Sequence, residues 1–158
     1  MLKTKILIPA FILLVGCFKE QSTNYYAYSK NSTNHTLVII TYLKGQIISS
    51  SIINLLPLMS FQVAKGTFRG LVWNGGFSSK YYDAMDSIRV TFNNVYTITH
   101  YNFNNPSPLN SKYYLNTSLR NIINFRSYTF ESKSLSKNQL ENNYNFEFIE
   151  QDYLDAKP

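Results

Sequence analysis

The chain has 158 residues, of which 44% are hydrophobic, 16% aromatic and 15% charged. This length predicts one domain, and the aromatic content argues against intrinsic disorder. One cysteine excludes an intramolecular disulfide, and two histidines with one cysteine exclude a Cys/His-rich zinc site. The net charge of +6 raises the question of nucleic-acid binding.

The first 17 residues have the layout of an export signal. Lys3 and Lys5 precede a ten-residue apolar stretch at 6–15. That stretch is well short of the roughly 20 residues of a transmembrane helix. A basic start before a short apolar stretch is typical of a secretory signal.

Residues 14–17, Leu-Val-Gly-Cys, resemble the lipobox of bacterial lipoproteins. The resemblance implies a signal peptide over 1–16, lipid attached to Cys17, and a lipidated tether over 17–24. Several acyl chains on one residue would give stable membrane anchoring. Phe18 stands where an Asp retains enterobacterial lipoproteins at the inner membrane, which implies the outer membrane in a host that has one. An ordinary cleaved signal and a buried N-terminal helix are the alternatives.

Residues 25–158 are predicted to form one all-β domain, an antiparallel β-sandwich of about seven to nine short strands. Strand signals recur about every ten residues, and no sustained helical period is present. A β-barrel is the alternative to the sandwich. The expected strands are Tyr25–Lys30, Thr36–Leu43, Gln46–Ile53, Ser60–Ala64, Leu71–Trp73, Ser87–Phe92, Val95–Tyr101, Arg126–Glu131 and Asn142–Ile149. A short turn of helix is expected over Glu150–Ala156.

The connections are predicted from turn chemistry and from the hydrophobic pattern. Thr36–Leu43 is apolar on both faces and is expected to be a central strand followed by a turn at Lys44-Gly45. At Asn93-Asn94, a three-residue loop sets Phe92 opposite Tyr96 and Val90 opposite Ile98, which keeps the apolar face together. Long polar connections are expected at 102–120 and at 133–141.

A second resemblance covers parts of the folded region. Residues 31–42, 86–94, 120–124 and 144–153 are similar to small uncharacterised lipoproteins of Bacteroidetes-type bacteria. Together with residues 1–17, these segments cover about a third of the chain. The family brings no established activity, so the resemblance implies a location and a fold only.

Catalytic and metal-binding patterns are weak. His35 and His100 are 65 residues apart without an HExxH pattern, which favours structural roles and no metal. No Gly-x-Ser-x-Gly elbow and no phosphate loop is present. Asp83 and Asp86 could serve a glycosidase, although Asp86 at a strand entrance is more typical of an Asx turn. Ser87 lies in a short Asp-Ser-Ile pattern that resembles an O-glycosylation acceptor of Bacteroidetes-type bacteria.

The basic residues give little support to nucleic-acid binding. Without Lys3 and Lys5, 13 basic and 9 acidic residues remain, a net charge of +4, and the basic ones are scattered singly. A nucleic-acid interface would cluster them.

Exposed aromatic residues are the better candidates for binding. Tyr and Trp combine an apolar body with a polar tip, which suits glycan or peptide recognition. The candidate ligand-contacting residues near the expected loops are Trp73, Tyr81, Tyr82, Tyr113 and Tyr114.

The sequence therefore predicts a lipid-anchored envelope protein, periplasmic or surface-facing, that has no enzymatic activity or cofactor. It is expected to bind a protein or a glycan through the loops of its sandwich. An envelope glycoside hydrolase that uses Asp83 or Asp86 with an acid of the C-terminal tail is one alternative. A structural lipoprotein without a ligand is the other.

Overall fold

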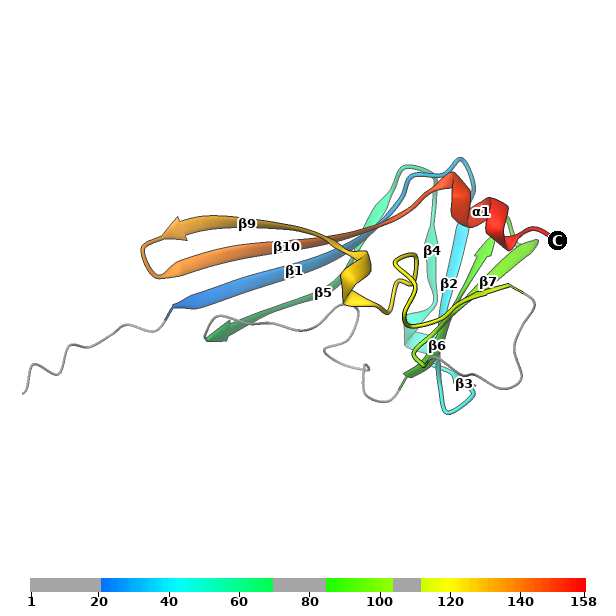
Figure 1. The fold of residues 1–158 in the computed structure, drawn as a ribbon, viewed down its shortest axis with the longest axis horizontal. Coiled ribbons are helices and arrows are strands. Elements are labelled where there is room, and N and C mark those ends of the chain that lie inside the picture. The colour runs from blue at the N-terminus through cyan, green and yellow to red at the C-terminus, as the bar shows by residue number, and fades with distance from the viewer. Residues whose placement is uncertain (1–20, 70–84, 104–111) are drawn as a thin grey trace, which may run out of the picture.

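The computed structural model describes residues 21–69, 85–103 and 112–158, which form two packed β-sheets and one short helix (Figure 1). The predicted Leu71–Trp73 strand lies outside these residues. The strands are β1 (Ser22–Asn31), β2 (Leu37–Leu43), β3 (Gln46–Ile47), β4 (Ile53–Leu55), β5 (Ser60–Arg69), β6 (Met85–Phe92), β7 (Tyr96–Tyr101), β8 (Tyr113–Tyr114), β9 (Thr129–Ser136) and β10 (Gln139–Phe148). The helices are α1 (Glu150–Ala156) and the 3-10 turns η1 (Ser49–Ser51) and η2 (Phe125–Ser127).

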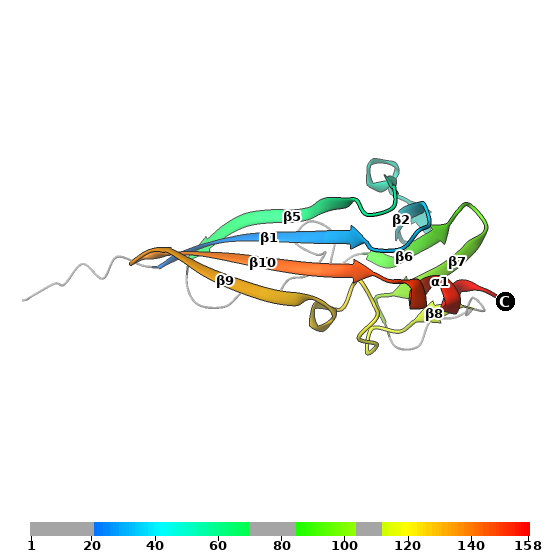
Figure 2. The same cartoon turned by 90° about the horizontal axis from the view of Figure 1, so that it is seen from above.

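The first sheet, in the order β5-β1-β10-β9, is elongated and projects from the rest of the molecule as an arm (Figures 1 and 2). β1 and β10 pair in parallel at its centre, and β5 and β9 pair antiparallel at its two edges. Along β1 the odd-numbered residues are buried and the even-numbered ones are mostly half-buried. The arm therefore has an inner face toward the second sheet and an outer face toward solvent.

The second sheet has the order β3-β2-β6-β7-β8, and β4 also pairs with β2. β2 is central, as its two apolar faces predicted, because β3 and β4 lie on one side and β6 on the other. α1 packs against β7. The predicted helical turn over Glu150–Ala156 is confirmed.

The hydrophobic core lies where the base of the arm meets the second sheet (Figure 1). β10 contributes Phe146 and Phe148, whose rings are 5.0 Å apart and nearly perpendicular. The fully buried residues from the other side and the intervening loop include Leu37, Ile39, Ile88, Val90, Phe92, Ile122 and Ile123. The distal part of the arm contributes little to this core, and all eight residues of β9 are exposed.

The all-β sandwich prediction is confirmed, with a correction to its topology. The prediction was antiparallel throughout, whereas β1–β10 and β7–β8 pair in parallel, so both sheets are mixed. β1 and β10 are separated by more than 100 residues, and no local pattern reports such a pairing. The described residues also contain ten strands, because β3, β4 and β8 are two or three residues long.

Three boundaries differ from the predictions for identifiable reasons. β1 begins at Ser22, which shortens the predicted tether over 17–24. The predicted Gln46–Ile53 strand is wrong, because the η1 turn interrupts it, held by a hydrogen bond from Ser51 Oγ to the Ile48 carbonyl. The closing hairpin is longer than predicted and turns at residues 137–138. All eight residues of β9 are exposed, so this strand lacks the apolar alternation that marks a half-buried strand.

The two predicted tight turns are confirmed. Lys44 and Gly45 both have positive φ, as a type I′ turn requires. After β6, Asn93 and Asn94 have φ of 50° and 59°, and the register sets Phe92 opposite Tyr96. Asparagine tolerates this left-handed region better than other non-glycine residues.

Gly66 on β5 lies in close contact with the ring of Tyr25. It pairs with Tyr25 on β1, and a Cβ at Gly66 would lie 2.6 Å from the Tyr25 ring. We expect Gly66→Ala to lower the free energy of unfolding by about 1–3 kcal/mol, because the ring must move from its packed position. Urea denaturation of Gly66→Ala in the wild-type and Tyr25→Leu backgrounds measures this. An equal cost in both backgrounds would contradict a Tyr25 clash.

Candidate binding site

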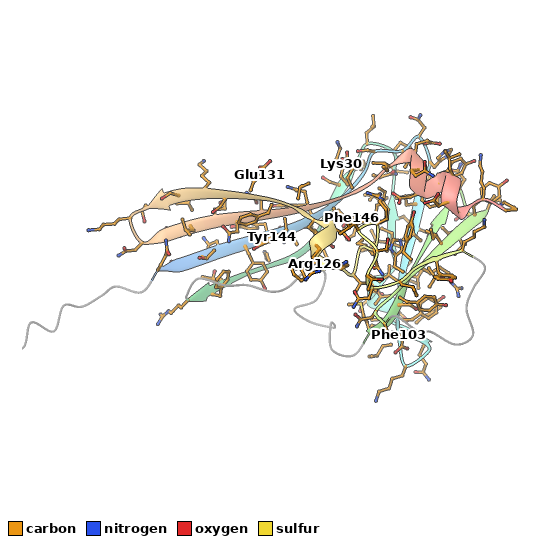
Figure 3. The ribbon with its side chains drawn as sticks, in the orientation of Figure 1. Lys30, Phe103, Arg126, Glu131, Tyr144 and Phe146 are labelled. Atoms are coloured by element: carbon orange, nitrogen blue, oxygen red, sulfur yellow. The ribbon has the colours of Figure 1, made fainter. Side chains whose placement is uncertain are left out.

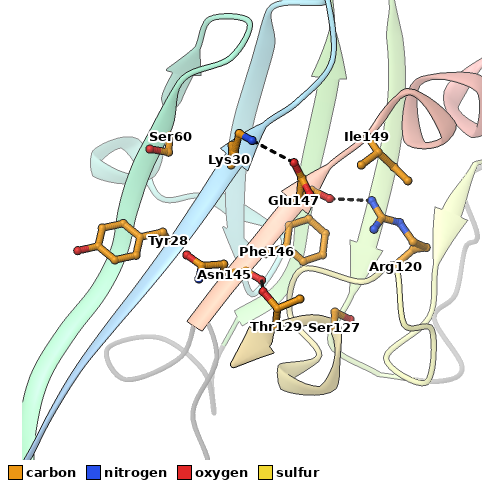
Figure 4. Close-up of a pocket in the computed structure, with 10 residues that line it drawn as sticks. All are labelled: Tyr28, Lys30, Ser60, Arg120, Ser127, Thr129, Asn145, Phe146, Glu147 and Ile149. Atoms are coloured by element: carbon orange, nitrogen blue, oxygen red, sulfur yellow. Dashed lines mark hydrogen bonds and ion pairs between the residues drawn. The ribbon is translucent and has the colours of Figure 1, made fainter. Parts of the chain in front are cut away.

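A pocket of about 480 Å³ lies on the outer face of the arm, near its base (Figure 4). The alternation of β1 and β10 turns Tyr28 and Lys30 to the same face as Asn145 and Glu147. The complete lining is Tyr28, Lys30, Ser60, Arg120, Ser127, Thr129, Asn145, Phe146, Glu147 and Ile149. All four strands of the arm therefore contribute to the pocket, together with η2 and the loop that precedes it.

The charged groups of the pocket are paired with one another or with other protein groups. Lys30 Nζ lies 3.3 Å from Glu147 Oε1, and the Ser32 hydroxyl donates to the same oxygen. The Ser32 hydrogen bond, together with Lys30, lowers the pKa of Glu147 against the opposing effect of partial burial, so this carboxyl is ionised at neutral pH. Arg120 Nη2 donates to the Glu147 carbonyl over 2.9 Å.

Arg120 is held in place by the C-terminal helix. Its Nε lies 3.0 Å from Asp152 Oδ1, and its Nη2 donates to Asp152 Oδ2. Asp152 is fully buried and also accepts from the Ile149 backbone N–H, which closes the N-terminus of α1. Two nitrogens of the guanidinium, Nε and Nη2, thereby bond to protein acceptors on one side of the pocket.

Three neutral polar side chains in the pocket differ from these charged groups in their hydrogen bonding. Among the described residues, the side chains of Tyr28, Ser60 and Asn145 make no hydrogen bond to protein. Tyr28 stacks against Tyr26 at a ring separation of 6.4 Å, and both tyrosines lie on the outer face of β1. The pocket thus combines an aromatic ring, an amide and a hydroxyl with balanced charge.

Two further pockets are present in the described part of the chain. One, of about 300 Å³ on the inner face of the arm, is lined by Phe125, Arg126, Tyr128, Phe130 and Tyr144. The other, of about 380 Å³, lies between β8 and the C-terminal tail and includes Tyr113 and Tyr114. Figure 3 shows Tyr144 and Arg126 on the inner side of the arm, opposite Glu131 and Lys30.

The sequence-predicted aromatic candidates are only partly described. Trp73, Tyr81 and Tyr82 lie outside the described residues. Tyr113 is partly exposed and packs its ring against Tyr101. The Tyr114 hydroxyl lies 2.5 Å from Asp155 Oδ2 and 3.1 Å from Asp152 Oδ1, so this residue fixes α1 to β8.

The carboxylate candidates do not form a catalytic pair in the described residues. Asp86 Oδ2 accepts from the Gly45 backbone N–H over 2.5 Å and closes the β2–β3 turn. The acids of α1 have other partners: Asp152 and Asp155 bond to the Tyr114 hydroxyl, and Glu150 bonds to His35. Asp83 lies outside the described residues, as does Cys17.

The remaining candidates have structural surroundings. Ser87 is 8% exposed in the middle of the second sheet, and its O-glycosylation stays a prediction. His35 stacks on Tyr153 and bonds to Glu150 and Asn93. Within the described segments, no group of three or more His, Cys, Asp or Glu is placed to hold a metal ion.

Sequence reasoning missed the pocket on the arm. The alternation of β1 indicates which of its residues face outward, but the pocket forms only when β10 and β9 lie beside it. Its residues are polar and scattered from 28 to 149, and no motif joins them.

Comparison with protein-family models, with curated proteins and with solved structures finds no match to this chain. In the described part of the chain, no helix is long and apolar enough to cross a membrane.

Proposed function

We propose that this chain is a lipid-anchored protein of the cell envelope that binds a neutral glycan in the outer-face pocket and catalyses no reaction. The observation that carries the proposal is a set of neutral side chains, Tyr28, Ser60 and Asn145, that have no hydrogen-bond partner among the described residues. They line a pocket whose charged side chains are paired with protein groups. A sugar offers C–H faces that pack on an aromatic ring and hydroxyls that bond to amides and hydroxyls. The volume falls within the usual range of ligand pockets.

This proposal places recognition on a sheet face, not on the loops that the sequence favoured. Glycan is preferred over protein because the pocket is small and most of its lining residues are polar or charged, whereas protein interfaces are extended and have apolar centres. An anionic ligand is less suited, because Lys30 and Arg120 already have acidic or carbonyl partners.

Tyr28 tests the proposal. We expect Tyr28→Ala to weaken binding to an array of neutral oligosaccharides by about tenfold or more, since it removes the stacking surface. Asn145→Ala should weaken binding by a similar factor. Tyr113→Ala is the matched control, because Tyr113 is a surface-accessible tyrosine that lines a different pocket.

The outcomes separate the alternatives. Loss of binding in Tyr113→Ala with full binding in Tyr28→Ala would move the site to the tail pocket. No binding of wild type to any oligosaccharide would contradict the glycan proposal and favour a structural lipoprotein or a protein ligand.

The lipid anchor has its own test. The basic start, the short apolar stretch and the lipobox-like residues 14–17 support lipidation of Cys17. We expect a radioactive fatty acid to label the wild-type chain in a bacterial host and not to label Cys17→Ala. Equal labelling of the two chains would contradict the anchor.

A further inference from the structure

β9 is an exposed edge of the arm. In the described residues β10 is its one partner strand, and all eight of its residues are exposed, including Phe130 at 55%. Edge strands present unpaired backbone N–H and C=O groups that can accept another strand. Figures 1 and 2 show β9 along one side of the arm.

The hydrogen-bonding direction of each residue in β9 follows from the neighbouring strands. Ser22 N–H donates to the Asn138 carbonyl and Ser32 N–H donates to the Phe148 carbonyl. Even-numbered residues of β10 therefore face β1, and its odd-numbered residues face β9. Asn143 and Glu141 of β10 pair with Glu131 and Lys133. The backbone groups of Glu131 and Lys133 thus point inward.

The outward backbone groups on β9 are consequently those of the even-numbered residues, Phe130, Ser132 and Ser134. An antiparallel partner strand must align its own outward groups with these. If the partner is a second copy of β9, the register centred on Ser132 pairs Ser132 with itself and Phe130 with Ser134 of the other copy. Six backbone hydrogen bonds result, two for each of three residue pairs.

The side chains favour this register over its neighbours. Centring on Ser132 sets Glu131 opposite Lys133 of the other copy, twice by symmetry, in the closely spaced non-hydrogen-bonded pairs. Shifting the centre to Glu131 sets Glu131 opposite itself, and centring on Lys133 does the same for Lys133. Opposite charges across strands stabilise a pair and like charges destabilise it.

We propose that the chain forms a symmetric dimer through antiparallel pairing of β9 with β9 of a second copy, centred on Ser132. The two arms then form one continuous sheet with their outer faces on the same side. The interface is isologous, as a two-fold axis requires. The dimer carries the two outer-face pockets on a shared surface. The dimer proposal does not depend on the pockets binding a glycan.

Sedimentation velocity on the full chain in a mild non-ionic detergent, over a range of concentrations, tests the dimer. The detergent shields the apolar residues 6–15. We expect wild type to dimerise, and Lys133→Glu to raise the dissociation constant about tenfold or more, because two attractive pairs become repulsive. Lys137→Glu makes the same charge change at the hairpin turn and should dissociate as wild type does.

The register is tested by charge exchange. The double variant Glu131→Lys, Lys133→Glu restores opposite charges across the interface and should restore the wild-type dissociation constant. A wild-type monomer at all concentrations, a dimer insensitive to Lys133→Glu, or a double variant no stronger than Lys133→Glu would each overturn the proposal.

Discussion

Lowering the pH from 6.5 to 5 should cost the protein about 2 kcal/mol of unfolding free energy through His100 alone. His100 is fully buried on β7, with ring contacts to Tyr114, Phe146 and Phe148. Two effects lower the pKa of His100 from 6.5 to about 3: burial is the larger, and the positive charge of Arg120 is the smaller. Protonation in the folded state is therefore disfavoured throughout the mildly acidic range.

The direction of the effect follows from proton binding. Below pH 6.5 the unfolded chain takes up a proton at His100, whereas the folded chain does not until about pH 3. The unfolded state binds more protons, so stability is fully present above pH 6.5 and is lost as the pH falls. The loss between pH 6.5 and 3 is about 4 kcal/mol, a large part of a typical domain's stability.

The surroundings of His100 identify the best substitution. Its Nδ1 accepts from the Ile122 backbone N–H over 3.1 Å, so the proton of the neutral ring is on Nε2. Nε2 has no hydrogen-bond partner in the described structure. Asn provides an oxygen near the position of Nδ1 and does not titrate. His100→Asn should therefore be less stable than wild type at pH 7 because it leaves a cavity, but its stability should be nearly constant from pH 6.5 to 5.

Urea denaturation at half-unit pH steps between 7 and 5 measures this difference. The pKa of Glu147 is lowered in the fold, so Glu147 changes the free energy of unfolding only below the ordinary pKa range of a carboxyl. The change between pH 7 and 5 is therefore assigned to His100. His35→Gln is the matched control, because it removes the other histidine and should keep the acid slope that His100 produces. A slope as steep in His100→Asn as in wild type would contradict the assignment.

His100 also illustrates what the sequence could and could not indicate. Its position at the end of a predicted strand was correct, and so were the register of that hairpin and the central place of β2. These features depend on neighbours within about ten residues, where hydrophobic alternation and turn chemistry act. The complete burial of His100 depends on Phe146 and Phe148, which arrive from a distant strand.

The arm was the least predictable part for the same reason. Its central pairing joins residues near 22–31 with residues near 139–148, and its β9 edge is exposed on both faces. Tyr28 and Asn145 become neighbours only through that pairing. A polar residue on an outer face has the same local pattern whether it lines a pocket or contacts water alone.

Removing the Arg120 side chain should destabilise the fold by about 3–5 kcal/mol at neutral pH. Arg120 is the cationic partner of Asp152, which is fully buried and also lies 3.1 Å from the Tyr114 hydroxyl. In Arg120→Ala the carboxylate loses two charge-assisted hydrogen bonds and stays buried with its charge uncompensated. The variant also loses the guanidinium packing on the Phe146 ring, 5.4 Å away.

Asp152→Asn should cost less than Arg120→Ala, although both remove one partner of the same ion pair. Asn keeps an acceptor for the Ile149 backbone N–H, and the Arg120 side chain that loses its partner is 31% exposed and can be hydrated. The double variant should cost less than the sum of the single ones, since each single variant breaks the same interaction.

The order of these costs distinguishes a buried charge from simple loss of packing. Urea denaturation of the two single variants and the double variant at pH 7 gives the order, with Arg126→Ala as the control. Arg126 lies over the exposed Phe125 ring at 5.9 Å, and its loss should change stability by no more than about 0.5 kcal/mol. If Asp152→Asn cost as much as Arg120→Ala and the double variant equalled their sum, the pair would act as two independent contacts. The buried carboxylate would then not be the element that fastens α1 and the base of the arm to the second sheet.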